Sequence, residues 1–308
     1  MITTICLNPC FDRTVEVETL KMGELNRIRS VRQDMGGKAI NVATVAHRLG
    51  LDCRCIGCMG ENGAEQLTAM MEKEGLRHAF LTVPGSVRTN MKIISDDYKG
   101  VTELNEPGAS LTKENLEAFF ALAQEKAKDS DTMVLTGSLP PDIPPSTYRD
   151  LMKKMEGARC ILDTTGEALL LGAEAKPFLI KPNLTELRET LKLELRTLRN
   201  IRDAAMIFIT KGVQHVIVSM GEMGAMYVNE STTLYAPALR VEVNSTVGAG
   251  DAMIGGLLKG LEVEGGDVAK AFRYGVAAGA ASVMTEGTQL IRPEDFEKLL
   301  NQVKIQEV

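Results

Sequence analysis

The sequence is poor in several features that mark other classes of protein. Its 308 residues carry 35 Lys and Arg against 41 Asp and Glu, and this net charge of −6 gives no general attraction to nucleic acid or anionic lipid. No apolar run approaches the roughly 18 residues that cross a bilayer, and the first residues lack the basic start of a secretory signal. We therefore expect a cytoplasmic enzyme with no nucleic-acid or membrane partner, which holds any anionic ligand locally.

Cysteine and histidine are also sparse. Six cysteines are too few for a disulfide scaffold in a chain of this length. Cys55 and Cys58 form one C-x-x-C, which could be half of a zinc site or a redox pair, but no second C-x-x-C and no H-x-x-x-H completes it. Because Cys53 and Cys55 share one face of a short predicted strand, we expect these cysteines to pack as small apolar residues. The three histidines share no spacing that indicates a metal site or a catalytic triad.

Short apolar runs alternate with amphipathic helical patterns, which is typical of an α/β fold around a mostly parallel sheet. The predicted strands cover residues 2–7, 53–58, 132–136, 160–163, 178–181 and 216–220. The predicted helices cover residues 38–49, 64–74, 113–128 and 146–155. No repeat or linker composition divides the chain, so we expect a single domain over residues 1–308.

Two stretches depart from this alternation of strands and helices. Residues 13–18 with 27–34, and later residues 89–103, show the side-chain alternation of extended strands, and the second contains turn residues around position 97. These strands fall outside the predicted main sheet. They predict a small second sheet, with segments at about 11–35 and 87–106, which could cover a cleft or pair with another subunit.

The strongest chemical signal is a glycine-rich turn that precedes an apolar helix. Gly248, Ala249 and Gly250 are followed directly by Asp251. Exposed backbone N–H groups at a helix start bind anions, and glycines let a ligand approach them. The pattern matches neither the P-loop nor the G-x-G-x-x-G dinucleotide motif. A carboxylate at this place could take a proton from a substrate hydroxyl while the amides stabilise a transferring phosphoryl group; the alternative is that Asp251 only caps its helix.

A second glycine pair, Gly36 and Gly37, precedes a helix whose first turn contains Lys38 and, one turn in, Asn41. A cation and bare amides converge there, which favours a phosphate or a sugar hydroxyl as ligand. The alternative is a solvated lysine at a capped helix.

Lys181, Asn183 and Glu186 follow a buried strand. Asn183 and Glu186 have the spacing of a capping box, which is one explanation for them. The functional alternative places Glu186 near a Mg²⁺–water cluster and Lys181 near nucleotide phosphates. Further glycines end strands at 137 and at 221–224, and ligands of open α/β sheets collect at such strand ends.

Five motifs, in this order along the chain, resemble the PfkB family of ribokinase-like carbohydrate kinases, and in particular its phosphosugar branch. They are Asn8-Pro-Cys-Phe-Asp12, Gly36-Gly-Lys-Ala-Ile-Asn41, Thr136-Gly-Ser-Leu-Pro140, Lys181-Pro-Asn183 with Glu186, and Ser245-Thr-Val-Gly-Ala-Gly-Asp251. The resemblance implies a three-layer sandwich with a central sheet flanked by helices and a β-sheet lid. It also implies phosphorylation of a sugar hydroxyl by ATP with Mg²⁺. In the relatives that the resemblance indicates, K⁺ sites occur near the motif at Ser245–Asp251, and no residue of this sequence decides whether K⁺ is required.

The resemblance also assigns residues. It makes Asp251 the catalytic base and forms the anion hole from Gly248, Ala249 and Gly250. The residues implied for the sugar substrate are Asp12, Arg27, Gly36, Gly37, Lys38, Asn41, Arg88, Asn90 and Ser138. Those implied for the nucleotide are Lys181, Asn183, Glu186, Ser219, Gly221, Gly224 and Thr246, with Glu186 acting on Mg²⁺ through water.

The substrate expectation follows from the cations. Lys38 and Arg88, with Arg27 from the lid, would grip a phosphate already on the sugar, for which simple sugar kinases have no use. Fructose 1-phosphate is the first expected substrate, and tagatose 6-phosphate and fructose 6-phosphate are alternatives; a non-catalytic sugar-phosphate sensor is the alternative of another class. Ala39 replaces a glycine usual in this branch and adds a methyl group close to the sugar site; whether this narrows or reshapes the site is left open by the sequence. Lid strands invite pairing, so a homodimer is also expected.

Overall fold

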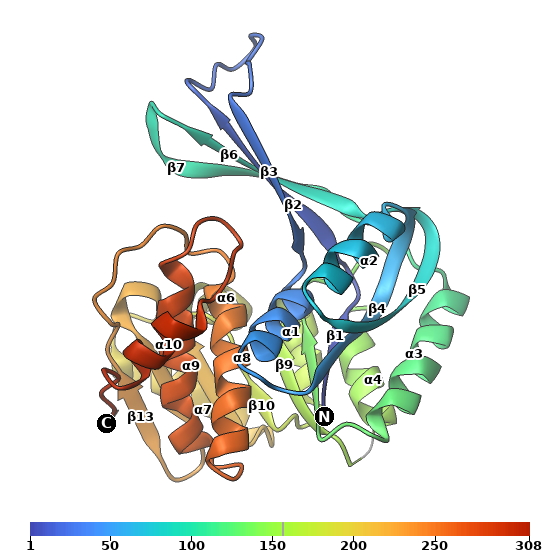
Figure 1. The fold of residues 1–308 in the computed structure, drawn as a ribbon. Coiled ribbons are helices and arrows are strands. Elements are labelled where there is room, and N and C mark those ends of the chain that lie inside the picture. The colour runs from blue at the N-terminus through green and yellow to red at the C-terminus, as the bar shows by residue number, and fades with distance from the viewer. Residues whose placement is uncertain (156) are drawn as a thin grey trace.

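A ten-stranded sheet forms the centre of the molecule in the computed structural model, which describes residues 1–155 and 157–308 (Figure 1). Its strand order is β14-β13-β12-β11-β10-β9-β8-β1-β4-β5, and the run from β11 to β5 is parallel whereas β12, β13 and β14 form an antiparallel edge. The strands are β1 (Ile2–Cys6), β4 (Cys53–Asn62), β5 (Arg77–Ser86), β8 (Thr132–Thr136), β9 (Arg159–Asp163), β10 (Leu179–Ile180), β11 (His215–Ser219), β12 (Ala225–Val228), β13 (Thr233–Ala236) and β14 (Gln306–Glu307). The predicted α/β class is confirmed, and each predicted strand is present.

Helices cover both faces of this sheet. One face carries α1 (Lys38–Arg48), α2 (Ala64–Lys73), α8 (Ala249–Val263), α9 (Val268–Val283) and α10 (Pro293–Leu300). The other carries α3 (Lys113–Ala127), α4 (Thr147–Lys154), α5 (Gly166–Ala173), α6 (Leu184–Leu191) and α7 (Leu198–Thr210). The result is the expected three-layer arrangement. Among the helices described, none is long and apolar enough to cross a membrane.

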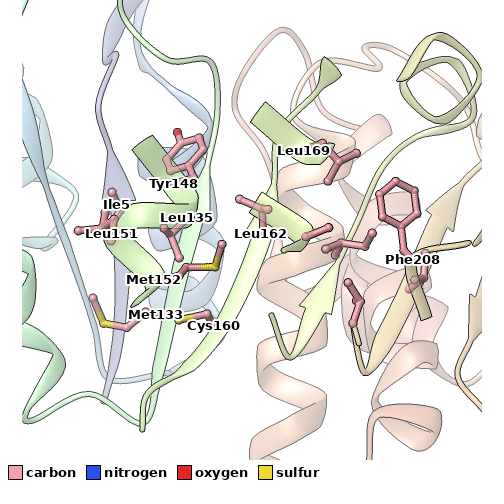
Figure 2. Packing of buried hydrophobic residues seen from close by; sticks show 14 of the residues in the cluster. Ile5, Met133, Leu135, Tyr148, Leu151, Met152, Cys160, Leu162, Leu169 and Phe208 are labelled. Atoms are coloured by element: carbon pink, nitrogen blue, oxygen red, sulfur yellow. The ribbon is translucent and has the colours of Figure 1, made fainter. Parts of the chain in front are cut away.

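The core between the sheet and the second helix layer is built from large apolar side chains (Figure 2). Ile5, Leu135 and Leu162 project from neighbouring strands, and Tyr148 and Leu169 meet them from α4 and α5. Burial of each such side chain stabilises the fold by about 1.5–3 kcal/mol. This packing fixes the strands, and therefore it also fixes the polar side chains that follow them.

All six cysteines are buried free thiols, and the expected packing of Cys53 and Cys55 as small apolar residues of a strand is confirmed. Burial raises the pKa of Cys6 and of Cys58 to about 12, so neither is a reactive thiolate at neutral pH. In the described parts of the chain, no cluster of His, Cys, Asp and Glu side chains is arranged to hold a metal ion.

The small second sheet stands apart from the body at the top of Figure 1 and forms the lid. Its strands are β2 (Cys10–Val17), β3 (Ser30–Gly36), β6 (Arg88–Ser95) and β7 (Tyr98–Asn105), in the order β3-β2-β6-β7. They lie where the alternating stretches predict them. Asp34 of β3 accepts a 2.9 Å hydrogen bond from Thr288, and Arg32 donates to the Glu286 carbonyl, so the lid contacts the segment between α9 and α10.

Candidate active site

A cavity of about 1450 Å³ lies between the lid and the carboxyl ends of the parallel strands. This is where an open α/β sheet gathers ligands, beside the point at which strand order reverses between β1 and β8. Its size exceeds the 300–1,000 Å³ typical of a single small-molecule site, and it has room for two ligands. The lining includes, from the residues predicted for the site, Asp12, Gly37, Lys38, Asn41, Arg88, Asn90, Ser138, Lys181, Asn183, Glu186, Ser219, Gly221, Gly224, Thr246, Gly248, Ala249, Gly250 and Asp251.

Asp251 sits in the first turn of α8 with its carboxyl group at the cavity wall. Gly248 precedes the helix with φ +80°, so the turn exposes the N–H groups that begin α8. Asn41 of α1 donates a 2.8 Å hydrogen bond from Nδ2 to Asp251 Oδ2. Within the described chain no side-chain hydrogen bond caps α8, and the bond that the Asp251 carboxylate accepts comes from Asn41 instead.

Burial raises the pKa of Asp251 to about 6, although the ammonium of Lys38 pulls the value down. The carboxylate of Asp163 raises the pKa of Asp251 further, whereas the hydrogen bond from Asn41 lowers it. A carboxyl group with this pKa is ionised at pH 7 and still basic enough to accept a proton in a transition state. The position therefore suits a general base.

Asp163 anchors two lysines at the wall of the cavity. It is only 1% exposed and lies 3.3 Å from Lys181 Nζ and 3.5 Å from Lys38 Nζ, and Thr136 donates a 2.9 Å hydrogen bond to it. Burial alone would raise the pKa of Asp163, but the two ammoniums and the hydroxyl hold it below its ordinary value. A methyl group placed on Gly250 would lie 3.1 Å from Lys181 Nζ, so this cation lies directly beside the first turn of α8.

Glu186 shows both features that the sequence left open. Its side chain and that of Asn183 form a capping box at α6, with two 2.8 Å hydrogen bonds. Its other carboxylate oxygen, Oε1, lies 3.4 Å from Lys38 Nζ at the cavity wall. The nearby Asp163 raises the pKa of Lys38 against its burial, so the lysine stays charged. The cap therefore fixes a carboxylate in the site.

The lid supplies a second buried ion pair. Lys92 Nζ lies 3.1 Å from Asp12 Oδ2, and each of these side chains is only 7% exposed. Asn90 donates to Asp12 Oδ1 at 3.4 Å and to Cys10 Sγ at 3.2 Å. Cys10 in turn donates from its thiol to Asp12 Oδ1 at 3.6 Å. The carboxylate of Asp12 is thus held at the cavity wall from three sides.

Arg88 lies next to this group, at the start of β6. Its guanidinium donates to the Asn8 carbonyl at 3.2 Å and to the Glu106 carbonyl at 3.2 Å. The side chain of Asn8 donates to Ser138 Oγ at 3.3 Å. These bonds fix an arginine with spare N–H donors, which is a suitable partner for an anion, at the lid end of the cavity.

The far end of the cavity is mostly apolar. Its wall there comes from α9 and from the segment that leads to α8, and it contains Leu239, Val241, Val243, Val276, Ala280 and Val283 together with Arg240. A flat aromatic group such as a nucleotide base fits this composition, whereas the lid end is polar and charged. The cavity therefore has two chemically different halves with Asp251 between them.

Two of the predicted site residues, Arg27 and Gly36, lie outside the lining of the cavity. Arg27 is exposed in the segment between β2 and β3, outside the lining of this cavity. Gly36 lies behind the lining, where a methyl group would meet Cys10 Sγ at 2.7 Å. Lys38 lines the cavity and lies 3.5 Å from the carboxylate of Asp163 and 3.4 Å from that of Glu186. Ala39, whose effect on the sugar site the sequence leaves open, is fully buried in the core and outside the lining of the cavity.

Two residues of the site, Asp163 and Lys92, are absent from the sequence-based assignments. Both had a signal. Asp163 directly follows the apolar run of β9, at the carboxyl end where the sheet gathers ligands. Lys92 is two residues after Asn90 on a strand, and therefore on the same face of the lid.

Comparison with known proteins gives one consistent result. Residues 6–295 match the family described as pfkB family carbohydrate kinase. A 1-phosphofructokinase of Vibrio cholerae is 33% identical over 306 residues, which cover 99% of this chain and 96% of the relative. The crystal structure of phosphofructokinase-2 from Escherichia coli in complex with potassium is 28% identical, with a TM-score of 0.90 over 98% of each chain. Ribokinase of Thermotoga maritima, 24% identical over 97% of this chain and 99% of that chain, shares the fold with a TM-score of 0.79.

Proposed function

This chain belongs to the pfkB family of carbohydrate kinases, and we propose that it is a 1-phosphofructokinase, which converts fructose 1-phosphate and ATP to fructose 1,6-bisphosphate and ADP. Curated relatives with that name are 33–35% identical to nearly the whole chain. The observation that carries the chemistry is the buried carboxyl group of Asp251, held by Asn41 at the start of α8 between a polar and an apolar half of one cavity.

The transfer proceeds in line. The 6-hydroxyl oxygen of the sugar attacks the γ-phosphorus of ATP and forms a new O–P bond, while the bond to the β,γ-bridging oxygen breaks and ADP leaves with that electron pair. Asp251 accepts the hydroxyl proton at Oδ1, because Oδ2 accepts the hydrogen bond from Asn41. The backbone N–H groups at Gly248, Ala249 and Gly250, with the ammonium of Lys181 beside them, stabilise the negative charge of the transferring group.

Magnesium and ATP fit the donor set around Glu186. Mg²⁺ keeps several of its waters and binds through phosphates and one or two carboxylates. Both oxygens of Glu186 already contact protein groups, which suits contact with the ion through water. When bound, the ion neutralises charge on the phosphates; Lys181 and Lys38 add positive charge at the same place, and Ser219, Gly221 and Gly224 border the nucleotide half.

Arg88 is the proposed partner of the phosphate that the substrate already carries, because it is the fixed arginine at the lid end of the cavity. Asp12, Asn41 and Asn90 hold sugar hydroxyls in this proposal. Arg27 could reach a substrate only from the lid of a second copy, since it lies outside the cavity of its own chain.

An ADP-release assay with fructose 1-phosphate, fructose 6-phosphate and tagatose 6-phosphate tests the assignment. We expect the highest kcat/KM with fructose 1-phosphate. A higher value with fructose 6-phosphate would assign the activity of the Escherichia coli structural relative instead, and a higher value with tagatose 6-phosphate would assign the remaining alternative. Absence of ADP release with all three would leave the sugar-phosphate sensor, which the intact Asp251 and anion hole disfavour.

A homodimer through the lid completes the proposal. The lid exposes several large apolar side chains, namely Ile28, Val31, Ile94, Tyr98, Val101 and Leu104, and exposed apolar surface is a feature of interaction sites. Light scattering on the purified protein should give twice the chain mass, and Leu104→Asp should shift the population towards one chain mass. A monomeric wild-type protein would refute the dimer without touching the proposed activity.

A further inference from the structure

The lid end of the cavity contains polar atoms that the protein itself leaves unmatched. Asn90 Oδ1 is buried and, within residues 1–155 and 157–308, accepts no hydrogen bond. Lys92 is buried as well, and in the same ranges its ammonium makes one hydrogen bond, to Asp12 Oδ2 at 3.1 Å. An ammonium carries three N–H donors, so two of them lack a protein partner.

These unmatched groups lie together and face the cavity. Asn90 and Lys92 are two residues apart on β6, so their side chains leave the same face of the lid, and both line the cavity. Asp12 pairs with Asn90 across the sheet and holds both side chains through its two carboxylate oxygens. The arrangement is therefore fixed before any ligand arrives.

A hydroxyl group has the complementary set of atoms. Its hydrogen can be donated to Asn90 Oδ1 while its oxygen accepts from Lys92 Nζ. A phosphate does not fit this position, because it has no donor for Asn90 Oδ1 and because the carboxylate of Asp12 is adjacent. Buried polar groups without hydrogen-bond partners raise the free energy of the complex, and a correctly placed hydroxyl removes this penalty by bonding to them. The site should therefore bind a sugar without this hydroxyl much more weakly.

We propose that Lys92, together with Asn90, determines substrate specificity by binding one ring hydroxyl of the phosphosugar, at C3 or C4. This inference rests on the proposed function, since it takes a ketohexose phosphate as the substrate. Lys92 thus contacts the substrate directly, in addition to holding Asp12.

The test measures kcat/KM for fructose 1-phosphate and for its 3-deoxy and 4-deoxy analogues. We expect the kcat/KM of the wild-type enzyme to be at least about 10²-fold lower with one of the analogues than with fructose 1-phosphate. Lys92→Met should lower kcat/KM for fructose 1-phosphate by about 10²-fold. In this variant, kcat/KM for fructose 1-phosphate should exceed that for the same analogue by less than threefold. The KM for ATP should not change. Lys113→Met, which removes a lysine that is 84% exposed on α3, is the control and should behave as wild type.

The outcomes separate the two proposals. If wild type fails to phosphorylate fructose 1-phosphate, the proposed function falls. If it does so but tolerates both analogues within twofold, the inference is wrong whatever the variants do. If Lys92→Met keeps the wild-type discrimination, the lysine only supports the lid. Asn90→Ala provides the same comparison where Lys92→Met does not fold, and it should lose discrimination against the same analogue.

Discussion

Asn41 Nδ2 donates a 2.8 Å hydrogen bond to Oδ2 of Asp251, a residue 210 positions later in the chain. This contact joins the first turns of α1 and α8. Each helix begins at a glycine with positive φ, Gly37 at +111° and Gly248 at +80°. The bond orients the carboxylate and leaves its other oxygen for a substrate hydroxyl. Several properties of the enzyme should therefore depend on Asp251.

Asp251→Asn should lower kcat by at least about 10³-fold, because the amide cannot accept the proton of the attacking hydroxyl. The change keeps the shape of the side chain, so binding of ATP, measured by calorimetry, should remain within a few fold of wild type. Turnover close to normal would exclude Asp251 as the base.

The pH dependence should follow the pKa of Asp251, which burial raises to about 6. Only the ionised carboxylate can accept a proton, so kcat/KM should fall about tenfold per unit below pH 6 and level off above it. Initial rates between pH 5 and 9 check this. A profile that stays flat down to pH 5 would contradict the assignment.

Asp251→Asn should also make the protein more stable at neutral pH. The folded protein holds the Asp251 proton more tightly than the unfolded chain does, so ionisation of this buried group destabilises the fold as pH rises from about 4 to above 6. Asparagine avoids this cost. We expect a gain in the free energy of unfolding on the order of 1–3 kcal/mol at pH 7.5, which disappears towards pH 4. Urea unfolding at both pH values measures it, and a variant less stable than wild type at pH 7.5 would contradict the expectation.

Asp163→Asn should have two effects. It removes the carboxylate between Lys38 and Lys181, and loss of one partner of a buried ion pair destabilises by about 3–5 kcal/mol. It also removes a charge that raises the pKa of Asp251, so the acid limb of the kcat/KM profile should move to lower pH. Phosphate groups of the substrates also titrate near pH 6, but their pKa in solution cannot respond to this variant. An unmoved limb would therefore assign the limb to the substrates.

Gly248→Ala should damage the anion hole. The φ of +80° disfavours any residue with a side chain, and the added methyl group would lie 2.6 Å from Leu290 Cδ2. Gly50→Ala is the matched control, because Gly50 has φ +79° with open space around it. We expect the control to lose about 1 kcal/mol of stability and keep its activity, and Gly248→Ala to lose more stability and most of its kcat. Equal losses in the two variants would show that the contact with Leu290 has no effect.

The sequence by itself determined the alternation of strands and helices, the lid strands, and the motifs around Asp251, Asn41 and Glu186, because these depend on local periodicity and on residues close in the chain. Only the tertiary structure decided where side chains point once distant segments meet. The ion pair of Asp12 and Lys92 depends on the register between β2 and β6, and the direction of Lys38 depends on Asp163, 125 residues later. The burial of Ala39 follows in the same way from packing between α1 and the sheet. Electrostatic partners and packing neighbours are long-range contacts, and a local pattern carries no information about them.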